Sequence, residues 1–345
     1  MTYRATVEVP SEPRIFSDKR GENPVMLAIH NLAVTAALGT AARLGVFDAV
    51  AEGPVSLSLL AQQTSTQPQS LRPILDILVG ERLLNYRAKR YALSVEGHGW
   101  LHPDSPHCIT TVLPWMLDLL KWWGGLYEAM TGAEEYRPYL QGAKQDWLRT
   151  VRAEYETSRL HADEVADALA LPRTARSVID VGGGSGWYSA VLCRRNPQLR
   201  ATVIDEAQSV EIAREIMWET GMDEVVTHEV GDIFTADLGG PHDAALCLSV
   251  LNGVPETKVV GLLRRIRASL HPGGVIALMR VERPDADVAQ SQAAAAMELF
   301  LRLLSGLDAA SPQELSAQLT AAGFAPPCVV KLGSPYLRLV VARAL

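Results

Sequence analysis

The chain has 345 residues, a formal net charge of −7 and a hydrophobic content of 48%. This length predicts two domains, or one large domain with an appendage, and the hydrophobic content excludes an intrinsically disordered chain. The negative charge disfavours a protein that holds nucleic acid by electrostatics. Four scattered cysteines lack CxxC spacing, so we interpret them as small hydrophobic residues in a reducing compartment: Cys108, Cys193, Cys247 and Cys328.

Residues 1–22 lack hydrophobic periodicity and predict a flexible arm without a secretory signal. Residues 24–51 have a helical pattern rich in small side chains, which suits a core or a subunit interface. The uncharged stretch 24–42 contains His30 and Asn31 among other polar residues, which is unfavourable for a membrane span. We therefore expect a soluble, cytoplasmic protein with no membrane partner.

Residues 53–97 predict two short helices and a small hairpin, which is a winged-helix arrangement. A DNA-reading version needs a basic recognition helix, but the helix over 68–81 sets Arg72 against Asp76 and Glu81. We predict an all-helical, winged-helix-like domain over 23–105, apart from that hairpin, and no nucleic-acid partner.

Residues 106–172 predict a helical linker that is rich in large side chains. Most of these side chains suit a helical core, but their density also suits the wall of a pocket for a flat ligand. Met297 and Phe300 share one face of a later helix, where core packing is the competing explanation. The predicted substrate-binding residues are Trp115, Met116, Tyr155, Met297 and Phe300.

Strands and helices alternate over residues 173–345. Short apolar strands are expected at 177–182, 200–205, 225–234, 243–250 and 274–281. Nearly continuous apolar strands separated by helices are typical of a parallel sheet that is covered on both faces. The predicted fold class is α/β, with a Rossmann-like, mostly parallel sheet.

The segment VIDVGGGSGWY, residues 178–188, predicts a strand ending at Asp180, a glycine loop and a helix. Such a loop at the carboxyl end of the first strand lies at the usual ligand edge of an open α/β sheet. Asp205 ends the second strand, where a carboxylate can accept hydrogen bonds from both ribose hydroxyls, and Asp232 ends the third. The loop lacks GxGxxG spacing, so a nucleoside with a short amino-acid tail fits better than a pyrophosphate.

The ordered segments DVGGGSG, IDEA, GDIF and LHPGGVIAL resemble the successive motifs of class I S-adenosylmethionine-dependent methyltransferases. The likeness extends to the small-molecule O-methyltransferases of plants and bacteria, whose N-terminal dimerisation domain is similar to residues 44–97. The resemblance covers residues 24–345. It implies a homodimer, a small-molecule substrate, S-adenosylmethionine as cofactor and S-adenosylhomocysteine as product.

The resemblance also assigns residues of the cofactor site. It places the methionine moiety beside Asp180, Gly182 and Gly184, and the ribose on Asp205. On the same resemblance, Asp232, with Ile233 or Phe234, is expected to flank the adenine, and Ser249, which follows the fourth strand, is a further candidate for cofactor contact. Helix capping or loop solvation is the competing explanation for the aspartates.

The resemblance breaks after the fourth strand. Members of this subgroup have a histidine there as general base, whereas this chain has Asn252. An amide has no titratable group in the useful range, although it can donate and accept hydrogen bonds. Glu282 and Asp308 match the supporting carboxylates of the family, or are solvated loop charges. We find no convincing replacement base in the sequence.

Three functions remain open at this point. The first is methyl transfer to a nucleophile that needs little or no base, with Asn252 as a positioning residue. The second keeps S-adenosylmethionine but changes the chemistry to hydroxylation, decarboxylation or cyclisation. The third is a non-enzymatic winged-helix ligand sensor. The sequence favours the first.

Overall fold

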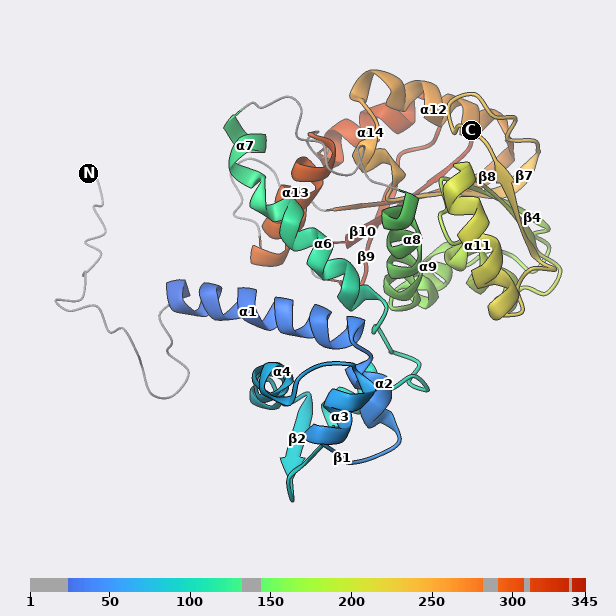
Figure 1. The fold of residues 1–345 in the computed structure, drawn as a ribbon. Coiled ribbons are helices and arrows are strands. Elements are labelled where there is room, and N and C mark those ends of the chain that lie inside the picture. Colours follow the sequence, from blue (N-terminus) through green and yellow to red (C-terminus); the bar gives the residue numbers. More distant parts are fainter. Residues whose placement is uncertain (1–23, 132–143, 282–290, 307–310, 335–336) are drawn as a thin grey trace, which may run out of the picture. The chain divides into compact units, whose positions relative to one another are not determined.

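The computed structural model describes residues 24–131, 144–281, 291–306, 311–334 and 337–345. The chain forms two compact units, Met1–Pro103 and Asp104–Leu345 (Figure 1). Among the predicted residues, Glu282 and Asp308 lie outside the described part, as does the side chain of Asn252.

Over its described residues, the first unit combines five helices with a small antiparallel sheet in the order β1-β3-β2. Ser56 begins α3 by accepting a hydrogen bond from the backbone N–H of Leu59 at 3.4 Å, and Pro68 stands in the first turn of α4. The predicted helices and hairpin are present, and a short third strand that the sequence did not predict pairs with β3. The elements are α1 (Pro24–Arg43), α2 (Val46–Ala51), β1 (Val55–Ser56), α3 (Leu57–Gln63), α4 (Pro68–Gly80), β2 (Leu84–Arg87), β3 (Arg90–Leu93) and α5 (Val95–Leu101).

Helix α1 is apolar and poorly covered within the unit. Four of its large hydrophobic side chains are exposed: Val25, Leu27, Ile29 and Leu32. By length and composition alone, Val25–Arg43 is the one helix among the described residues that could cross a membrane. A helix that packs against another protein surface passes the same test.

The second unit contains a seven-stranded sheet in the order β6-β5-β4-β7-β8-β10-β9. The strands from β6 to β8 in this order are parallel, whereas β10 is antiparallel to both β8 and β9. This mixed sheet confirms the predicted Rossmann-like fold. The strands are β4 (Ser177–Val181), β5 (Arg200–Asp205), β6 (Val226–Val230), β7 (His242–Leu248), β8 (Leu270–Val281), β9 (Cys328–Lys331) and β10 (Leu337–Arg343).

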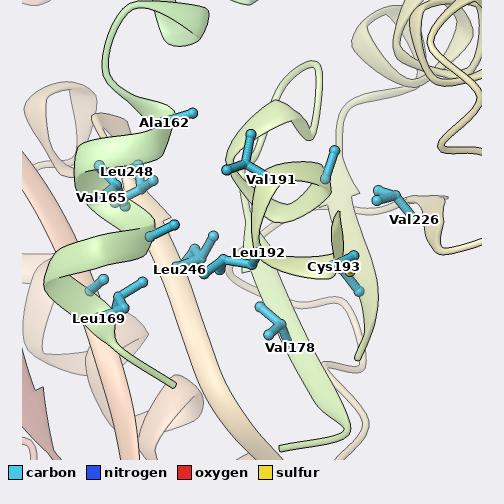
Figure 2. Close-up of a cluster of buried hydrophobic side chains, with 14 of the residues drawn as sticks. Ala162, Val165, Leu169, Val178, Val191, Leu192, Cys193, Val226, Leu246 and Leu248 are labelled. Atoms are coloured by element: carbon cyan, nitrogen blue, oxygen red, sulfur yellow. The ribbon is translucent and has the colours of Figure 1, made fainter. Parts of the chain in front are cut away.

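Helices cover both faces of this sheet. On one face, Val178 and Leu246 pack with side chains of α9 and α10, as Figure 2 shows. On the other face, Ile179 and Cys247 pack with side chains of α12 and α14. Alternate residues of one strand therefore enter different cores, which explains why these strands are apolar along their whole length. The helices are α6 (Val112–Gly124), α7 (Leu126–Thr131), α8 (Lys144–Arg159), α9 (Ala162–Leu169), α10 (Trp187–Arg195), α11 (Ala207–Glu219), α12 (Glu256–Ala268), α13 (Gln292–Ser305) and α14 (Pro312–Ala321).

Candidate active site

The glycine loop joins β4 to α10 in a conformation that side chains would obstruct. Gly182 and Gly184 have φ angles of 67° and 53°, in the left-handed region that glycine tolerates best. A Cβ on Gly182 would lie 2.5 Å from Cγ2 of Val250, and one on Gly183 would lie 2.4 Å from the carboxyl carbon of Asp180. The close packing of Val250 and Asp180 therefore requires glycine at these positions, in a loop that lies at the usual ligand edge of the sheet.

Asp180 lies beneath this loop and is 1% exposed. The Ser189 hydroxyl donates a hydrogen bond of 2.7 Å to its Oδ2, whereas its Oδ1 is buried without a partner. Burial raises the pKa of the Asp180 carboxyl to about 7, although the Ser189 hydrogen bond acts in the opposite direction. A buried carboxyl oxygen with an unused site suits a ligand that brings a donor or a positive charge.

Asp205 ends β5 and is tied to the same loop. The backbone N–H of Gly184 donates to its Oδ2 at 2.7 Å, and the N–H of Glu206 donates to its Oδ1 at 2.7 Å. Burial raises the pKa of Asp205, and these two N–H groups counteract the rise. The carboxylate is half-buried, so it remains accessible at the ligand edge.

The predicted adenine neighbours follow β6. Asp232 is exposed and accepts a hydrogen bond of 2.7 Å from the backbone N–H of Phe234, so it stabilises its own turn. Ile233 and Phe234 are half-buried, and the Lys258 ammonium lies 5.0 Å from the centroid of the Phe234 ring. This local hydrogen bond agrees with the loop interpretation of Asp232, and it leaves the second carboxylate oxygen open to other contacts.

The segment after β7 approaches the glycine loop. Ser249 has a φ of 64°, and its backbone N–H donates to the carbonyl of Met279 on β8 at 3.2 Å. The next four residues form a 3-10 turn, η1 (Val250–Gly253), which includes the backbone of Asn252. The close approach of Val250 to Gly182 brings this turn against the loop. Topology thus places Asn252 near the predicted cofactor site.

The structure brings together only part of the predicted aromatic wall. Trp115 of α6 meets Phe300 of α13 edge-on at 6.2 Å between ring centroids, and Trp123 lies 5.8 Å from the same Phe300 ring. Tyr155 instead packs edge-on against Trp187 of α10 at 5.2 Å. Met116 and Met297 are half-buried on α6 and α13.

The sequence did not predict Glu154 of α8 as a site residue. A Cβ on Gly184 would lie 3.4 Å from Oε2 of Glu154, so this carboxylate faces the loop. Nearby protein atoms desolvate the Glu154 carboxyl and raise its pKa, and the charge of Asp205 raises it further. The side chain is nevertheless exposed to solvent, so water screens these effects more than it does at Asp180.

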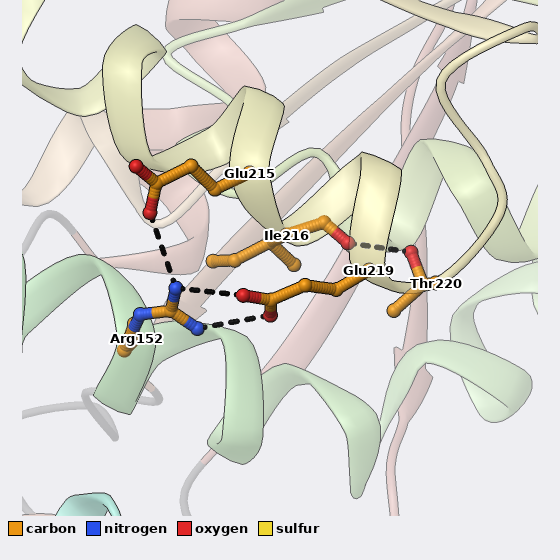
Figure 3. A network of polar contacts seen from close by, with 5 residues as sticks. All are labelled: Arg152, Glu215, Ile216, Glu219 and Thr220. Carbon is orange, nitrogen blue, oxygen red and sulfur yellow. Dashed lines mark hydrogen bonds and ion pairs between the residues drawn. The ribbon is translucent and has the colours of Figure 1, made fainter.

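Contacts on both sides of Glu154 fix helix α8. The Arg152 guanidinium donates to Glu219 at 3.0 and 3.1 Å and to Glu215 at 3.3 Å, both on α11 (Figure 3). The contact between Tyr155 and Trp187 attaches the same turn to α10. The carboxylate of Glu154 is thus held above the loop by a helix outside the sheet.

Two family matches cover most of the chain. Residues 125–325 match the O-methyltransferase domain, and residues 26–97 match the O-methyltransferase dimerisation domain. The chain belongs to the O-methyltransferase family. The predicted family is therefore confirmed, together with methyltransferase activity and S-adenosylmethionine as the cofactor of the family.

Three known proteins illustrate what this methyltransferase is similar to. Human N-acetylserotonin methyltransferase, solved in complex with S-adenosylmethionine, has a TM-score of 0.81 at 22% identity and covers 95% of this chain and 99% of its own. Mitomycin biosynthesis 6-O-methyltransferase of Streptomyces lavendulae is 26% identical over 98% of this chain and 99% of that protein. Aclacinomycin 10-hydroxylase RdmB of Streptomyces purpurascens is 28% identical over 74% of this chain and 71% of that protein.

The loop of this methyltransferase fits the cofactor of the family. S-adenosylmethionine carries hydroxyl and ammonium donors and a positively charged sulfur. Around the glycine loop the chain offers acceptors and negative charge: the unpaired oxygen of Asp180, the edge carboxylate of Asp205 and the carboxylate of Glu154. The acceptor-rich edge therefore matches a cationic, donor-rich ligand.

Proposed function

We propose that this methyltransferase transfers a methyl group to a small, planar, aromatic or heteroaromatic acceptor, with positioning in place of a histidine base. The proposal is carried by the approach of η1 to the glycine loop, where Val250 lies against Gly182. This contact supports a placement of Asn252 beside the cofactor. When bound, S-adenosylmethionine supplies a methyl group on a positively charged sulfur, which is already a strong electrophile.

We assign the cofactor to the carboxyl edge of β4, β5 and β6. Asp180 and the loop glycines would hold the methionine part, Asp205 would accept hydrogen bonds from the ribose hydroxyls, and the turn after β6 would flank the adenine. Glu154 adds a negative charge that suits the ammonium group. The assigned residues are Asp180, Gly182, Gly184, Asp205, Asp232, Ile233, Phe234 and Ser249.

The acceptor would lie against the aromatic contact between α6 and α13. Trp115 and Phe300 provide flat apolar surface there, and the indole N–H of Trp115 is buried without a hydrogen-bond partner. An unused donor within an aromatic group suits a planar ligand that carries an acceptor. Met116 and Met297 would pack against the edges of the acceptor. Tyr155 would contribute indirectly, by positioning helix α8.

Asn252 would hold the acceptor or its developing charge by hydrogen bonding. Alignment and exclusion of water can supply much of the acceleration when the nucleophile is acidic or already ionised. Hydrogen-bond donors aimed at developing charge commonly contribute a few kcal/mol, so their loss is measurable. Glu282 and Asp308 would then stabilise the pocket instead of orienting a catalytic base.

The test is formation of S-adenosylhomocysteine over a panel of aromatic acids, phenols and heteroaromatic compounds. With the best acceptor, Asn252→Ala should lower kcat by at least about tenfold while S-adenosylhomocysteine affinity stays unchanged. The native pH–rate profile should show no inflection near ~6.5, the ordinary pKa of histidine. A neutral inflection that disappears when one histidine is replaced would contradict the positioning role, as would a rate gain in Asn252→His.

Reassigned chemistry is the second candidate, and the similarity to the hydroxylase RdmB favours it. The two candidates differ in their products. Methyl transfer releases one S-adenosylhomocysteine per turnover, whereas hydroxylation or decarboxylation leaves S-adenosylmethionine intact. Product formation from a panel compound without S-adenosylhomocysteine would therefore support the second candidate.

We further propose a homodimer formed through residues 24–100. The dimerisation-domain match and the exposed apolar side chains of α1 support it, because such a surface is stable when a partner covers it. The ion pair of Arg72 with Asp76 at 3.5 Å on α4 argues against DNA binding. Light scattering that finds only monomer at micromolar concentration would exclude the dimer, and a duplex shift in a low-salt gel would revive the ligand sensor. A cytoplasmic location remains a prediction.

A further inference from the structure

Arg280 is a buried charge inside an otherwise apolar strand. It lies near the carboxyl end of β8, is 6% exposed, and has Nε and Nη1 atoms that are buried without a hydrogen-bond partner. Burial lowers its pKa. Two of the three guanidinium nitrogens are thus buried without a hydrogen bond, and the burial of a charge in this way is unfavourable unless an anion pairs with it.

A second arginine faces the same side of the sheet. Arg338 of β10 is the direct antiparallel neighbour of Arg280. Directly opposite residues point to one face with Cβ atoms about 5 Å apart, where like charges repel each other. The Nη1 of Arg338 donates to the carbonyl of Leu337. Two arginines therefore stand opposite each other near this end of the β8–β10 pair.

One acidic group among the described residues acts on Arg280. Glu314 of α14 influences the pKa of Arg280, but its carboxylate accepts a hydrogen bond of 2.7 Å from the backbone N–H of Ser311 in a capping box. Cys247 on β7 is the other titratable neighbour, and burial raises the pKa of its thiol to about 12, so it stays neutral. Glu314 therefore acts on Arg280 only through its charge, and no salt bridge joins Arg280 to an acidic side chain within the described residues.

The position of Arg280 connects it with the proposed acceptor site. Its strand neighbour Met279 accepts the hydrogen bond from Ser249, immediately before η1. Leu251 of η1 enters the same hydrophobic cluster as Leu278, which shares the Arg280 face of β8. Helix α13, which carries Phe300, contacts both η1 and β8. The turn η1, the carboxyl end of β8 and helix α13 therefore lie in one region of the fold.

We infer that Arg280, supported by Arg338, binds the carboxylate of an aromatic acid, and that this acid is the methyl acceptor. The inference rests on the proposed function for the placement of the acceptor. A planar guanidinium matches a carboxylate with two parallel hydrogen bonds, and this pairing is strongest where water is excluded. The same arrangement rejects a neutral amide, because Arg280 would then remain buried without an anion.

The test compares three aromatic acids with their amides: benzoate, salicylate and 1-naphthoate against benzamide, salicylamide and 1-naphthamide. The measurement is calorimetry on the full chain saturated with S-adenosylhomocysteine. At least one acid should bind at least about tenfold more tightly than its amide, which corresponds to ~1.4 kcal/mol. Acids and amides that bind equally, or a protein that binds none of the six, would overturn the inference.

Three single-residue variants test whether Arg280 causes the preference for the acid over its amide. Arg280→Gln should remove the preference for the acid to within about twofold, and Arg280→Lys should keep part of it, since one charged hydrogen bond is worth more than a neutral one. Arg264→Gln is the matched control, because Arg264 is an exposed arginine on α12, and it should keep the full preference. A full preference in Arg280→Gln would contradict the inference.

Binding of S-adenosylhomocysteine distinguishes a failure of the proposed function from a failure of the inference on Arg280. S-adenosylhomocysteine should bind the native chain and all three variants with equal affinity. Should it fail to bind the native chain, the proposed function fails. Should it bind while the acid preference is absent, only the role of Arg280 fails. If Arg280→Gln does not fold, the acid–amide comparison in the native chain still decides the question.

Discussion

Replacing Asp180 by asparagine should make the ligand-free protein more stable at pH 8. The Asp180 carboxyl is almost fully buried, and one of its oxygens lacks a hydrogen-bond partner. Asparagine has nearly the same shape and keeps an oxygen that can accept the Ser189 hydrogen bond. The substitution therefore removes the buried negative charge and leaves the packing in place.

The magnitude follows from the pKa. Burial raises the pKa of Asp180 from 3.8 to about 7, so the folded chain binds this proton more tightly than the unfolded chain does. The neutral carboxyl contributes its full stability below pH 3.8, and this contribution is lost as the pH rises through 7. A gap of about 3 pH units corresponds to about 4 kcal/mol, which is the upper limit of the gain in Asp180→Asn at pH 8.

The assay is denaturant unfolding of the ligand-free chain between pH 5 and pH 8. The native chain should lose stability with rising pH more steeply than Asp180→Asn. Asp223→Asn, at an exposed aspartate, is the control and should follow the native curve. Affinity for S-adenosylhomocysteine should fall in Asp180→Asn, because the proposed site loses its buried charge. Parallel curves for the native chain and Asp180→Asn, or lower stability of the variant at pH 8, would refute the reasoning.

Three further predictions concern the glycine loop, its neighbour Asp205 and the ion pair that ties α8 to α11. Asp205→Ala should weaken S-adenosylmethionine binding at least about tenfold, because a charged acceptor is lost; unchanged affinity in calorimetry would remove the ribose assignment. Gly183→Ala should lower the free energy of unfolding by about 1–3 kcal/mol, since its Cβ would lie 2.4 Å from the Asp180 carboxyl carbon. Gly80→Ala is the control and should not lower it, because open space surrounds Gly80. Equal effects of the two substitutions would disprove the steric argument. A double-mutant cycle on Arg152 and Glu219 should give a coupling of about 0.5–1 kcal/mol that decreases in high salt, and a coupling of zero would mean that this ion pair does not fix α8.

The sequence predicted the cofactor edge well because its determinants are local. The apolar strand before Asp180, the glycines after it and the position of Asp205 at the next strand end all follow from short-range pattern. Parallel strands then bring their carboxyl ends to one edge without further information. The fold followed from the same alternation of strands and helices.

Other site residues depend on helix placement, which short patterns do not encode. Glu154 reaches the loop from α8, and nothing near it in the sequence indicates that contact. Tyr155 was grouped with Trp115 because both lie in one aromatic segment, but α8 turns Tyr155 toward α10. Arg280 did carry a signal, namely a lone charge inside an apolar strand, and a buried charge of this kind needs a partner.

The carboxylates around the glycine loop also affect how long the protein survives in a cell. Desolvation raises the pKa of Asp180 and of Glu154, and the nearby charge of Asp205 raises both further, so a cationic ligand at the loop would be favourable. A ligand that binds only the folded chain adds stability that grows with the ratio of its concentration to its Kd. Proteases act mainly on transiently unfolded chains, so degradation should slow as the supply of S-adenosylmethionine rises. The abundance of this protein would then follow the methyl-donor status of the cell even at a constant rate of synthesis.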